Sequence, residues 1–279
     1  MKATTIKRQI SHSFIYVILL LQSFLIILPI FIMVNSSLKP SREIFRNPFK
    51  LPDPITFKNF VKLFVTQNYG LYLMNSVIVS LSAIIIILIV SSLVSFALAK
   101  YTFKANKYFH MFFLMGLMLP IRLGTINLIQ MFIKLNLFNT PFALIAVYSA
   151  MGIPAGVLIF TGFIRDIPNE LMDAARVDGY TDTMIFLKII VPLLSPGIVV
   201  VAVYNLMPIW NDFWFPLILV NKPEFMTIPL ATAQLFGKHE TDFGLLYAIL
   251  TVAAIPPMVL FVGLSRYFIA GLTAGAIKG

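Results

Sequence analysis

The sequence predicts an all-α, polytopic membrane protein with six transmembrane helices and a short helix outside the membrane between the fourth and the fifth. Of its 279 residues, 59% are hydrophobic and only 11% are charged, whereas a soluble domain carries about a quarter charged residues. The apolar residues also fall into six runs. Each run can cross a hydrocarbon core of about 30 Å, which needs roughly twenty helical residues.

The first span is predicted at 14–34, after a terminal segment of residues 1–13. A signal peptide is the alternative, but its apolar part is shorter and is followed by a small-residue cleavage site. Here the sequence Asn35-Ser36-Ser37-Leu38-Lys39 follows instead. We therefore predict an uncleaved helix, joined by a loop of residues 35–70 to an uncharged second span at 71–99.

Proline and glycine interrupt the later spans. The third is broken at Pro120 and Gly124, and the fourth is bent at Gly152-Ile153-Pro154-Ala155-Gly156. Backbone freed by such breaks is tolerated in a membrane where it faces protein or a water-filled cavity. The four spans are predicted at 107–133, 141–163, 189–207 and 243–264, within a core of residues 71–265.

The net charge of +10 does not indicate nucleic-acid binding, because Lys and Arg lie in short connectors between apolar runs. Anionic lipid headgroups are the expected partners there. Eleven Lys and Arg residues lie on the side of the two termini and nine on the other side. This difference is too small for the positive-inside rule to set the orientation.

The sequence also indicates that the chain is not an enzyme. It has no cysteine, and its histidines His12, His110 and His239 lack metal-ligand spacing. No phosphate-binding loop occurs, since Gly237-Lys238 is followed by His239 and has no preceding glycine at the required spacing. We predict no catalytic residues, no metal site and no cofactor bound by this chain.

The connector between the fourth and fifth spans is unusually acidic, with five of the eleven acids inside residues 166–182. Pro168 suits the first turn of a helix, and Asp166 and Glu170 place negative charge near its N-terminus. Gly179 can adopt the left-handed conformation that ends a helix, and Thr181 can cap the next one. The sequence thus predicts a helix of about ten residues that ends sharply.

One face of this short helix is predicted to carry Leu171, Ala174 and Ala175, with Asp173 and Arg176 alongside. Two alanines on the exposed side would let a partner approach closely. The alternative interpretation is a solvated loop that only connects two spans.

The spacing of this stretch resembles a known signature. The chain has Asp173-Ala174-Ala175, three residues, Gly179, nine residues, and then Ile189-Ile190-Val191-Pro192. The membrane subunits of binding-protein-dependent, ATP-driven importers carry E-A-A, three residues, Gly, nine residues, then I-x-L-P. The departures, Asp for Glu and Val for Leu, keep the charge and the apolar character.

This resemblance implies that residues 168–179 form a cytoplasmic coupling helix that inserts into a separate ATPase subunit. It also implies that both termini are cytoplasmic, and that ATP and Mg bind to the partner ATPase subunits. The residues expected to couple to the ATPase are Pro168, Glu170, Leu171, Asp173, Ala174, Ala175, Asp178 and Gly179.

The resemblance extends along the chain to the smaller membrane subunit of the maltose-type sugar permeases. The matching stretches are Leu137-Phe138-Asn139-Thr140, Asp178-Gly179-Tyr180, Trp210-Asn211-Asp212-Phe213 and the cytoplasmic tail 266–279. It implies a carbohydrate importer, with an oligosaccharide as substrate, that contains a second homologous permease, two ATPase subunits and an extracellular sugar-binding protein. The tail is either disordered or threaded between the ATPase subunits.

Several polar residues lie inside predicted spans. Arg122 is deep in the third span, where a charge needs a partner or a water-filled cavity, and Asp212 is the obvious opposite charge. The two either line the sugar path or hold broken segments together. Other types suited to sugar binding, or to membrane interfaces in general, are Asn127, Gln130, Tyr148, Tyr204, Asn205, Trp210 and Trp214.

Other functions remain as alternatives. An importer of the same family could carry a non-sugar solute such as a glycerol phosphate. A stand-alone secondary transporter would show repeated halves and a midplane ionisable site, and only Arg122 is a deep charge here. A membrane enzyme would need clustered His, Asp or Glu, and the acidic stretch lacks histidine. The loops 35–70 and 221–242 are candidate docking sites for the binding protein.

Overall fold

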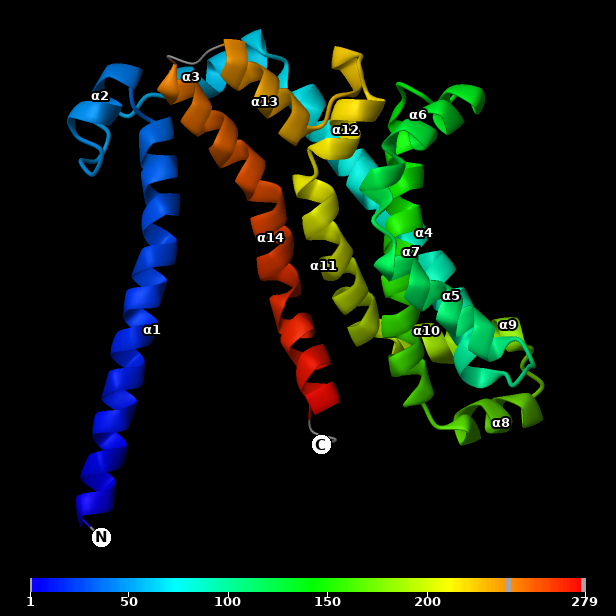
Figure 1. Ribbon diagram of the computed structural model, residues 1–279. Helices are drawn as coiled ribbons and strands as arrows, with labels where there is room; N and C mark the ends of the chain where they lie inside the picture. Colours follow the sequence, from blue (N-terminus) through cyan, green and yellow to red (C-terminus); the bar gives the residue numbers. More distant parts are fainter. Residues whose placement is uncertain (1, 239–241, 277–279) are drawn as a thin grey trace. The chain divides into compact units, whose positions relative to one another are not determined.

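The fold is described by a computed structural model (Figure 1), which covers residues 2–238 and 242–276 and the side-chain surroundings of residues 15–238 and 242–263. Every regular element in these ranges is a helix. Four helices are long and apolar enough to cross a membrane, and two bent helix pairs bring the number of spans to six if each pair is one span. The predicted all-α fold is confirmed, and the six predicted spans correspond to the four long helices and the two bent pairs. The predicted tail 266–279 lies outside the described side chains.

The chain forms two compact units, and the first contains residues 1–69 and 234–255. It includes α1 (Lys2–Ser37), α2 (Ser41–Arg46), α3 (Lys58–Val61), the π-helical turn η1 (Lys62–Thr66) and the first part of α14 (Phe243–Ala276). The loop predicted at 35–70 is therefore largely structured. Apolar side chains of α1 between Ile15 and Val34 are widely exposed, as expected for a helix that lies in lipid or against another membrane chain.

The second unit contains residues 70–233 and 256–279 and holds the main core. Its long helices are α4 (Tyr69–Lys100) and α7 (Pro141–Arg165), which were predicted as single spans. The other elements are α5 (Asn106–Met118), η2 (Ile121–Gly124), α6 (Thr125–Lys134), α8 (Asn169–Val177), α9 (Asp182–Ile185), η3 (Phe186–Ile190), α10 (Val191–Leu193), α11 (Ser195–Asn211), α12 (Trp214–Leu219), η4 (Pro223–Phe225) and most of α13 (Ile228–Lys238).

The third and fifth spans are broken. The helices on either side of Leu119–Pro120 differ in direction by 77°, as expected from the interruption predicted there. The fifth span differs from its prediction at 189–207, because its helices begin at Asp182 and bend by 72° at Leu194. Pro196 explains this bend, since a proline has no N–H to continue the ladder of the preceding helix and its ring crowds the preceding turn.

Two glycines of α7 allow α4 to pack closely against it. A Cβ atom on Gly152 would lie 2.3 Å from Ile87 Cδ1, and one on Gly156 would lie 2.6 Å from Ser91 Oγ. One turn further along, Ser95 Oγ donates a hydrogen bond of 2.9 Å to the Val157 carbonyl. Small residues at such positions let helix backbones approach in a membrane. The helix-contact role of the 152–156 motif is thereby supported, although Pro154 lies within it.

We expect Gly152→Val to force α4 and α7 apart and to lower the free energy of unfolding by about 2 to 3 kcal/mol, as overpacking of a close contact does. Gly162→Ala in the same helix is the matched control, because a Cβ there meets nothing within 4 Å. Thermal unfolding of the purified chain measures both. Equal midpoints for the two variants would contradict the close packing.

The motif Leu137-Phe138-Asn139-Thr140 has a structural role in the second unit. Asn139 has a positive φ of 63°, which asparagine tolerates better than most residues. Its side-chain oxygen accepts hydrogen bonds from the backbone N–H groups of Asn221 at 2.8 Å and Lys222 at 2.9 Å. Asn139 thus fixes the segment that follows α12.

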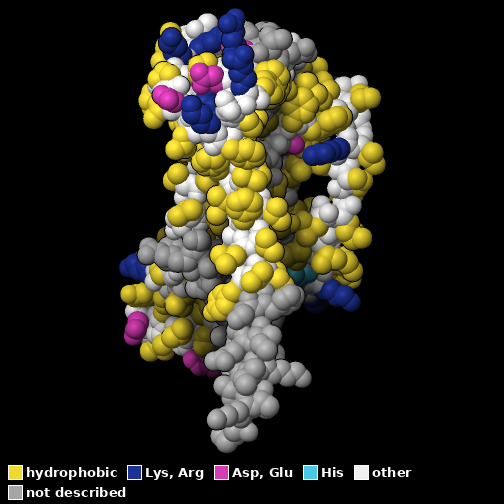
Figure 2. Space-filling model, turned by 90° about the vertical axis from the view of Figure 1, so that its left-hand side faces the viewer, with side chains coloured by type: hydrophobic (Ala, Val, Ile, Leu, Met, Phe, Trp, Pro, Cys, Tyr) yellow, Lys and Arg dark blue, Asp and Glu magenta, His cyan; other side chains and the backbone are white. Residues whose placement is uncertain are grey.

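The surface agrees with a membrane environment. Figure 2 shows hydrophobic side chains over most of the face in view and a group of basic side chains over the segment that includes α2. Such a separation of apolar and basic surface is typical of a protein that crosses lipid and meets headgroups at the ends of its spans.

Candidate functional site

The short helix α8 has the boundaries that its sequence predicts. Pro168 precedes it with φ −59° and ψ 139°, and Gly179 follows it with φ 83°. Beyond its end, Tyr180 N–H donates to the Ala175 carbonyl at 2.9 Å and Gly179 N–H donates to the Arg176 carbonyl at 3.0 Å. These two bonds form a Schellman motif, which satisfies the last carbonyls and stops the helix. Thr181 then caps α9, as predicted, by accepting from Met184 N–H at 3.4 Å.

The two faces of α8 differ from the prediction. Met172 and Ala175, three residues apart, are buried in the core of the second unit. Leu171, Ala174 and Val177 are exposed. The expectation that both alanines lie on the exposed side was therefore wrong for Ala175, because the helical period places it with Met172. Asp166 likewise lies at the C-terminal cap of α7, and only Glu170 lies in the first turn of α8.

Two basic side chains fasten α8 to its neighbours. Lys100, at the end of α4, donates hydrogen bonds to the Ile167 carbonyl and, at 2.9 Å, to Asn169 Oδ1. At the other end of α8, Arg176 pairs with Asp173 at 3.0 Å and with Asp182 of α9 at 3.4 Å. The helix is thus tied to α4 at its N-terminal end and to α9 from its last turn.

Aromatic side chains at the end of α4 and in η3 pack next to this attachment of α8. Phe96 of α4 contacts Tyr101 edge-on, with ring centroids 5.6 Å apart, and lies 5.4 Å from the ring of Phe186. Burial and a hydrogen bond with Asp182 raise the pKa of the Tyr101 hydroxyl, so it remains a proton donor. Together, these contacts make α8, α9 and the end of α4 one rigid group.

We expect Lys100→Met to loosen the junction between α7 and α8. Hydrogen bonds from a charged donor contribute about 1.5 to 3 kcal/mol, so amide hydrogen exchange in α8 should become at least tenfold faster. Lys104→Met is the control, since Lys104 has no hydrogen-bond partner among the described side chains. Unchanged exchange in the Lys100 variant would show that this attachment does not hold the helix.

A polar cavity of about 330 Å³ lies between the break of the third span and the C-terminal end of α11, the last helix of the fifth span. Arg122 from η2 and Asp212, which follows α11, face each other across it at 3.5 Å. Asp212 also accepts hydrogen bonds of 2.9 Å from the Tyr148 hydroxyl and of 2.9 Å from Phe215 N–H at the start of α12. The carboxylate therefore joins α7, α11, α12 and η2, and it also lines the cavity.

The structure brings five of the predicted path residues together and separates two from them. The residues that line the polar cavity are Arg122, Tyr148, Tyr204, Asn205 and Asp212. Trp210 is buried and does not line it. Asn127 lies instead in a separate, mostly apolar hollow of about 1140 Å³ with Phe112 and Pro154. This hollow lies at the bend of the third span, and both α5 and α6 line it.

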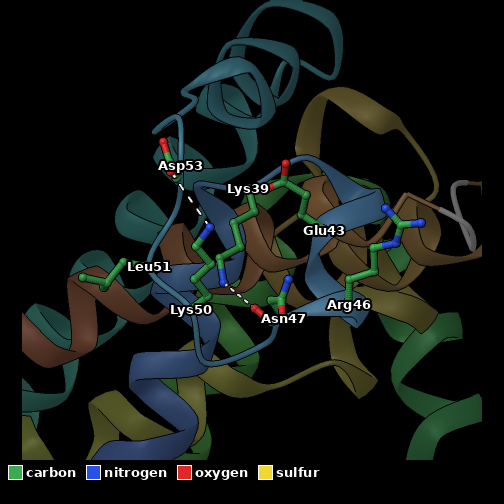
Figure 3. A pocket seen from close by; sticks show the side chains of 7 residues that line it. All are labelled: Lys39, Glu43, Arg46, Asn47, Lys50, Leu51 and Asp53. Atoms are coloured by element: carbon green, nitrogen blue, oxygen red, sulfur yellow. Dashed lines mark hydrogen bonds and ion pairs between the residues drawn. The ribbon is translucent and has the colours of Figure 1, made fainter.

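The loop after α1 is held by side chains that reach its backbone. Lys39 donates to the carbonyls of Asn47 at 3.0 Å and Pro48 at 3.3 Å, and Asn59 donates to those of Ser37 and Lys39. Seven side chains of this loop, labelled in Figure 3, line a small open cavity of about 170 Å³. Burial lowers the pKa of Lys39. The loop thus presents a fixed surface.

Asp242 links the loop that follows α1 to the start of α14 within the first unit. It accepts hydrogen bonds from the Ser41 hydroxyl at 2.9 Å, from Leu245 N–H at 3.1 Å and from Lys62. Partial burial raises the pKa of this carboxyl, but the hydrogen bonds from Lys62, Leu245 and Ser41 outweigh it, and the pKa lies below its usual value of 3.8. The contribution of ionised Asp242 to the stability of the first unit is therefore fully present above that pH, and it is lost as the pH falls below it.

We accordingly expect amide exchange in the segment 38–62, corrected for intrinsic rates, to quicken as the pH falls below about 4 in the wild-type chain. In the Asp242→Asn variant, the amides of this segment should exchange fast already at neutral pH, and their exchange should no longer depend on pH in this way. Asp53→Asn is the control, because Asp53 is 80% exposed and lies 3.9 Å from Lys50. A pH dependence that persists in the Asp242 variant would contradict this role.

Comparison with known proteins identifies the family. Residues 91–273 match the model of the binding-protein-dependent transport system inner membrane component. The chain belongs to this family. It is 35% identical over 261 residues to the arabinooligosaccharides transport system permease protein AraQ of Halalkalibacterium halodurans, a match covering 92% of this chain and 93% of that one.

Other similarities agree with this assignment. The melibiose/raffinose/stachyose import permease protein MelC of Bacillus subtilis is 31% identical over 253 residues, which cover 90% of this chain and 91% of the relative. A bacterial ABC transporter involved in the import of the acidic polysaccharide alginate has a chain of the same fold, with a TM-score of 0.82 and 17% identity over 93% of this permease and 97% of that chain.

The family membership confirms the interpretation of the 173–192 motif as that of an importer permease, and the chain is a multi-pass inner-membrane transport component and not an enzyme. Sequence reasoning did not find Lys100 or Tyr101, because no local pattern distinguishes them from residues that merely end a span. It could have found the buried pair Met172 and Ala175, whose spacing of three residues marks one helix face.

Proposed function

We propose that this permease forms half of the translocation path of an ATP-driven carbohydrate importer, with an oligosaccharide as its substrate. The named relatives support the substrate class, since AraQ and MelC are described as permeases for arabinooligosaccharides and for melibiose, raffinose and stachyose. A second homologous permease forms the other half. An extracellular binding protein delivers the sugar and docks on the loop 35–70 and the segment 221–242.

The observation that carries the coupling proposal is the rigid attachment of α8, which leaves Leu171, Ala174 and Val177 exposed. One of two cytoplasmic ATPase subunits, which bind ATP and Mg, holds this face and its flanking acids, Glu170 and Asp173. Because α8 is tied to α4 by Lys100 and to α9 by Arg176, its movement rotates these helices as one body. Pro168, Asp178 and Gly179 set its two ends, whereas Ala175 packs inward.

The polar cavity is proposed as part of the sugar path. Its aromatic and amide side chains, Tyr148, Tyr204 and Asn205, are of the types that stack on sugar rings and bind hydroxyl groups. Arg122 and Asp212 hold the broken spans around it. Asn127 and Trp210 lie elsewhere and are not included in this path.

The orientation can be tested directly, because the chain has no cysteine. Asp178→Cys introduces one exposed thiol after α8, and Lys50→Cys introduces one in the loop 35–70. A membrane-impermeant maleimide should label Asp178→Cys only from the cytoplasmic side, and added ATPase subunit should block this labelling. Lys50→Cys should be labelled only from outside. Labelling of Asp178→Cys from outside would refute the coupling role.

The substrate is tested by uptake in a deletion strain. Cells without this permease should lose uptake of a labelled oligosaccharide, and the plasmid-borne wild-type chain should restore it. Arabino-oligosaccharides and raffinose are the first probes, and glycerol phosphate represents the non-sugar alternative. If the deletion strain lost uptake of glycerol phosphate but kept uptake of both oligosaccharides, the substrate would be the non-sugar solute and the sugar assignment would be wrong.

A further inference from the structure

A second polar cavity, of about 580 Å³, lies where α4 and α7 end and α5 begins. Its lining includes the cationic side chains of Lys104, Lys107 and Arg165, with His110 beside them. None of its lining residues is an acid. The sugar-path cavity differs from it, because there the single cation Arg122 has Asp212 as its counter-ion.

These three cations have no counter-ion among the residues whose side chains the structure describes. Neither Lys104, Lys107 nor Arg165 forms an ion pair with any described residue. Two neighbouring basic residues, by contrast, have polar or acidic partners: Lys100 is hydrogen-bonded to Asn169, and Arg176 pairs with two aspartates. Three uncompensated positive charges around one cavity favour a negatively charged ligand.

Among the described residues, the side chain of Arg165 makes one hydrogen bond, and this bond also positions it for such a ligand. Its Nη2 lies 2.8 Å from His110 Nε2. Since a guanidinium group can only donate, His110 Nε2 accepts this bond. The other N–H groups of Arg165 remain available, and their fork geometry fits two oxygens of a phosphate group.

The start of α5 adds to the positive potential. This helix has 13 residues, and its N-cap residue Ala105 provides no side-chain hydrogen bond to the first turn. Asn106 and Lys107, which open the helix, line the cavity. The N–H groups of Asn106 and Tyr108 already donate to the carbonyls of Phe103 and Ala105, so it is the helix dipole that favours an anion there.

The surface next to the cavity is apolar. Along α5, the side chains of Tyr108, Met111, Phe112 and Met115 are at least half exposed. The cavity lies at the membrane interface, because α5 enters the bilayer and α7 leaves it at this end. A ligand that fits both surfaces has an anionic head and long apolar chains, and basic pockets between membrane helices bind the headgroups of anionic phospholipids.

We therefore propose that Lys104, Lys107 and Arg165 bind the phosphate of an anionic phospholipid whose acyl chains lie along the exposed face of α5. The site is separate from the coupling face of α8 and from the sugar-path cavity. The proposal needs only that α5 and α7 cross the membrane, so it stands even if the coupling role of α8 fails.

The test uses the full-length permease, purified with its partner subunits, in detergent with phosphatidylglycerol or phosphatidylcholine. Native mass spectrometry measures lipid retained by the wild-type chain and by the variant Lys104→Gln/Lys107→Gln/Arg165→Gln. The matched control, Lys58→Gln/Lys134→Gln/Lys222→Gln, removes the same number of charges away from the cavity. We expect preferential retention of phosphatidylglycerol, and an affinity about fivefold lower for each cation removed from the site.

A single variant and a competition experiment complete the test. The single variant Lys107→Gln serves if the triple variant does not assemble, and it should still bind phosphatidylglycerol about fivefold more weakly than wild type. Inorganic phosphate, added as a competitor, should not displace the lipid. Retention of phosphatidylglycerol by the site variants at the level of the control would overturn the proposal. Displacement by inorganic phosphate would overturn it too, in favour of a soluble-anion site.

Discussion

Leu171→Asp should uncouple this permease from its ATPase. Leu171 is 45% exposed on the outward face of α8, so the substitution leaves the fold of the chain intact. If α8 inserts into a groove of the ATPase subunit, a carboxylate at this position is buried without a partner. Loss of one central apolar contact costs about 2 kcal/mol or more, so the affinity for the ATPase should fall at least about thirtyfold. Substrate-stimulated ATP hydrolysis by the reconstituted assembly should be lost.

The matched control is Met184→Asp. Met184 is 44% exposed, on α9, and lies beyond the end of the short helix. It should co-purify with the ATPase and hydrolyse ATP as the wild-type chain does. Equal losses in both variants would point to a general effect of surface charge. Normal ATPase binding by Leu171→Asp would remove α8 from the interface.

Replacing Asp212 by alanine should produce the largest loss of stability. Its side chain is only 9% exposed and receives hydrogen bonds from Tyr148 and Phe215, and it pairs with Arg122. Removing it leaves the Tyr148 hydroxyl and one backbone N–H without their acceptor. Breaking a buried, hydrogen-bonded charge costs about 3 kcal/mol or more. Thermal unfolding of the purified chain should show a clearly lower midpoint, and transport should be lost.

Arg122→Gln separates the two functions of this pair. Arg122 is 66% exposed, and exposed ion pairs contribute only about 1 kcal/mol or less. We therefore expect this variant to fold nearly normally. If the cavity carries the sugar, sugar transport by the Arg122→Gln variant should still be impaired, mainly through a changed KM for the sugar. A loss of stability as large as that of Asp212→Ala would show that the arginine is chiefly structural.

The packing between the two sites suggests a route by which movement of α8 reaches the proposed sugar path. The rigid group around α8 includes the end of α4, and α4 packs through Ile87 and Ser91 against the glycines of α7. Tyr148 lies on α7 and donates a hydrogen bond to Asp212 at the C-terminal end of α11. A displacement of α8 would thus reach the cavity through closely packed helices, without any flexible segment on the way.

The sequence by itself determined the features that depend on neighbouring residues. The spans follow from runs of apolar side chains, and the ends of α8 follow from Pro168 and Gly179, whose backbone preferences act locally. The spacing from Asp173 to Pro192 was enough to predict the family. The pairing of Arg122 with Asp212 was also predicted, since a charge inside a membrane needs an opposite charge.

The tertiary structure decided what depends on residues far apart in the chain. It turned Ala175 inward, bent the fifth span at Leu194, attached α8 through Lys100, and separated Asn127 and Trp210 from the polar cavity. Apolar periodicity shows that a helix has a buried face, but in a chain that is apolar almost throughout it cannot show which neighbour covers that face. Only the packing of the helices fixes which side chains meet.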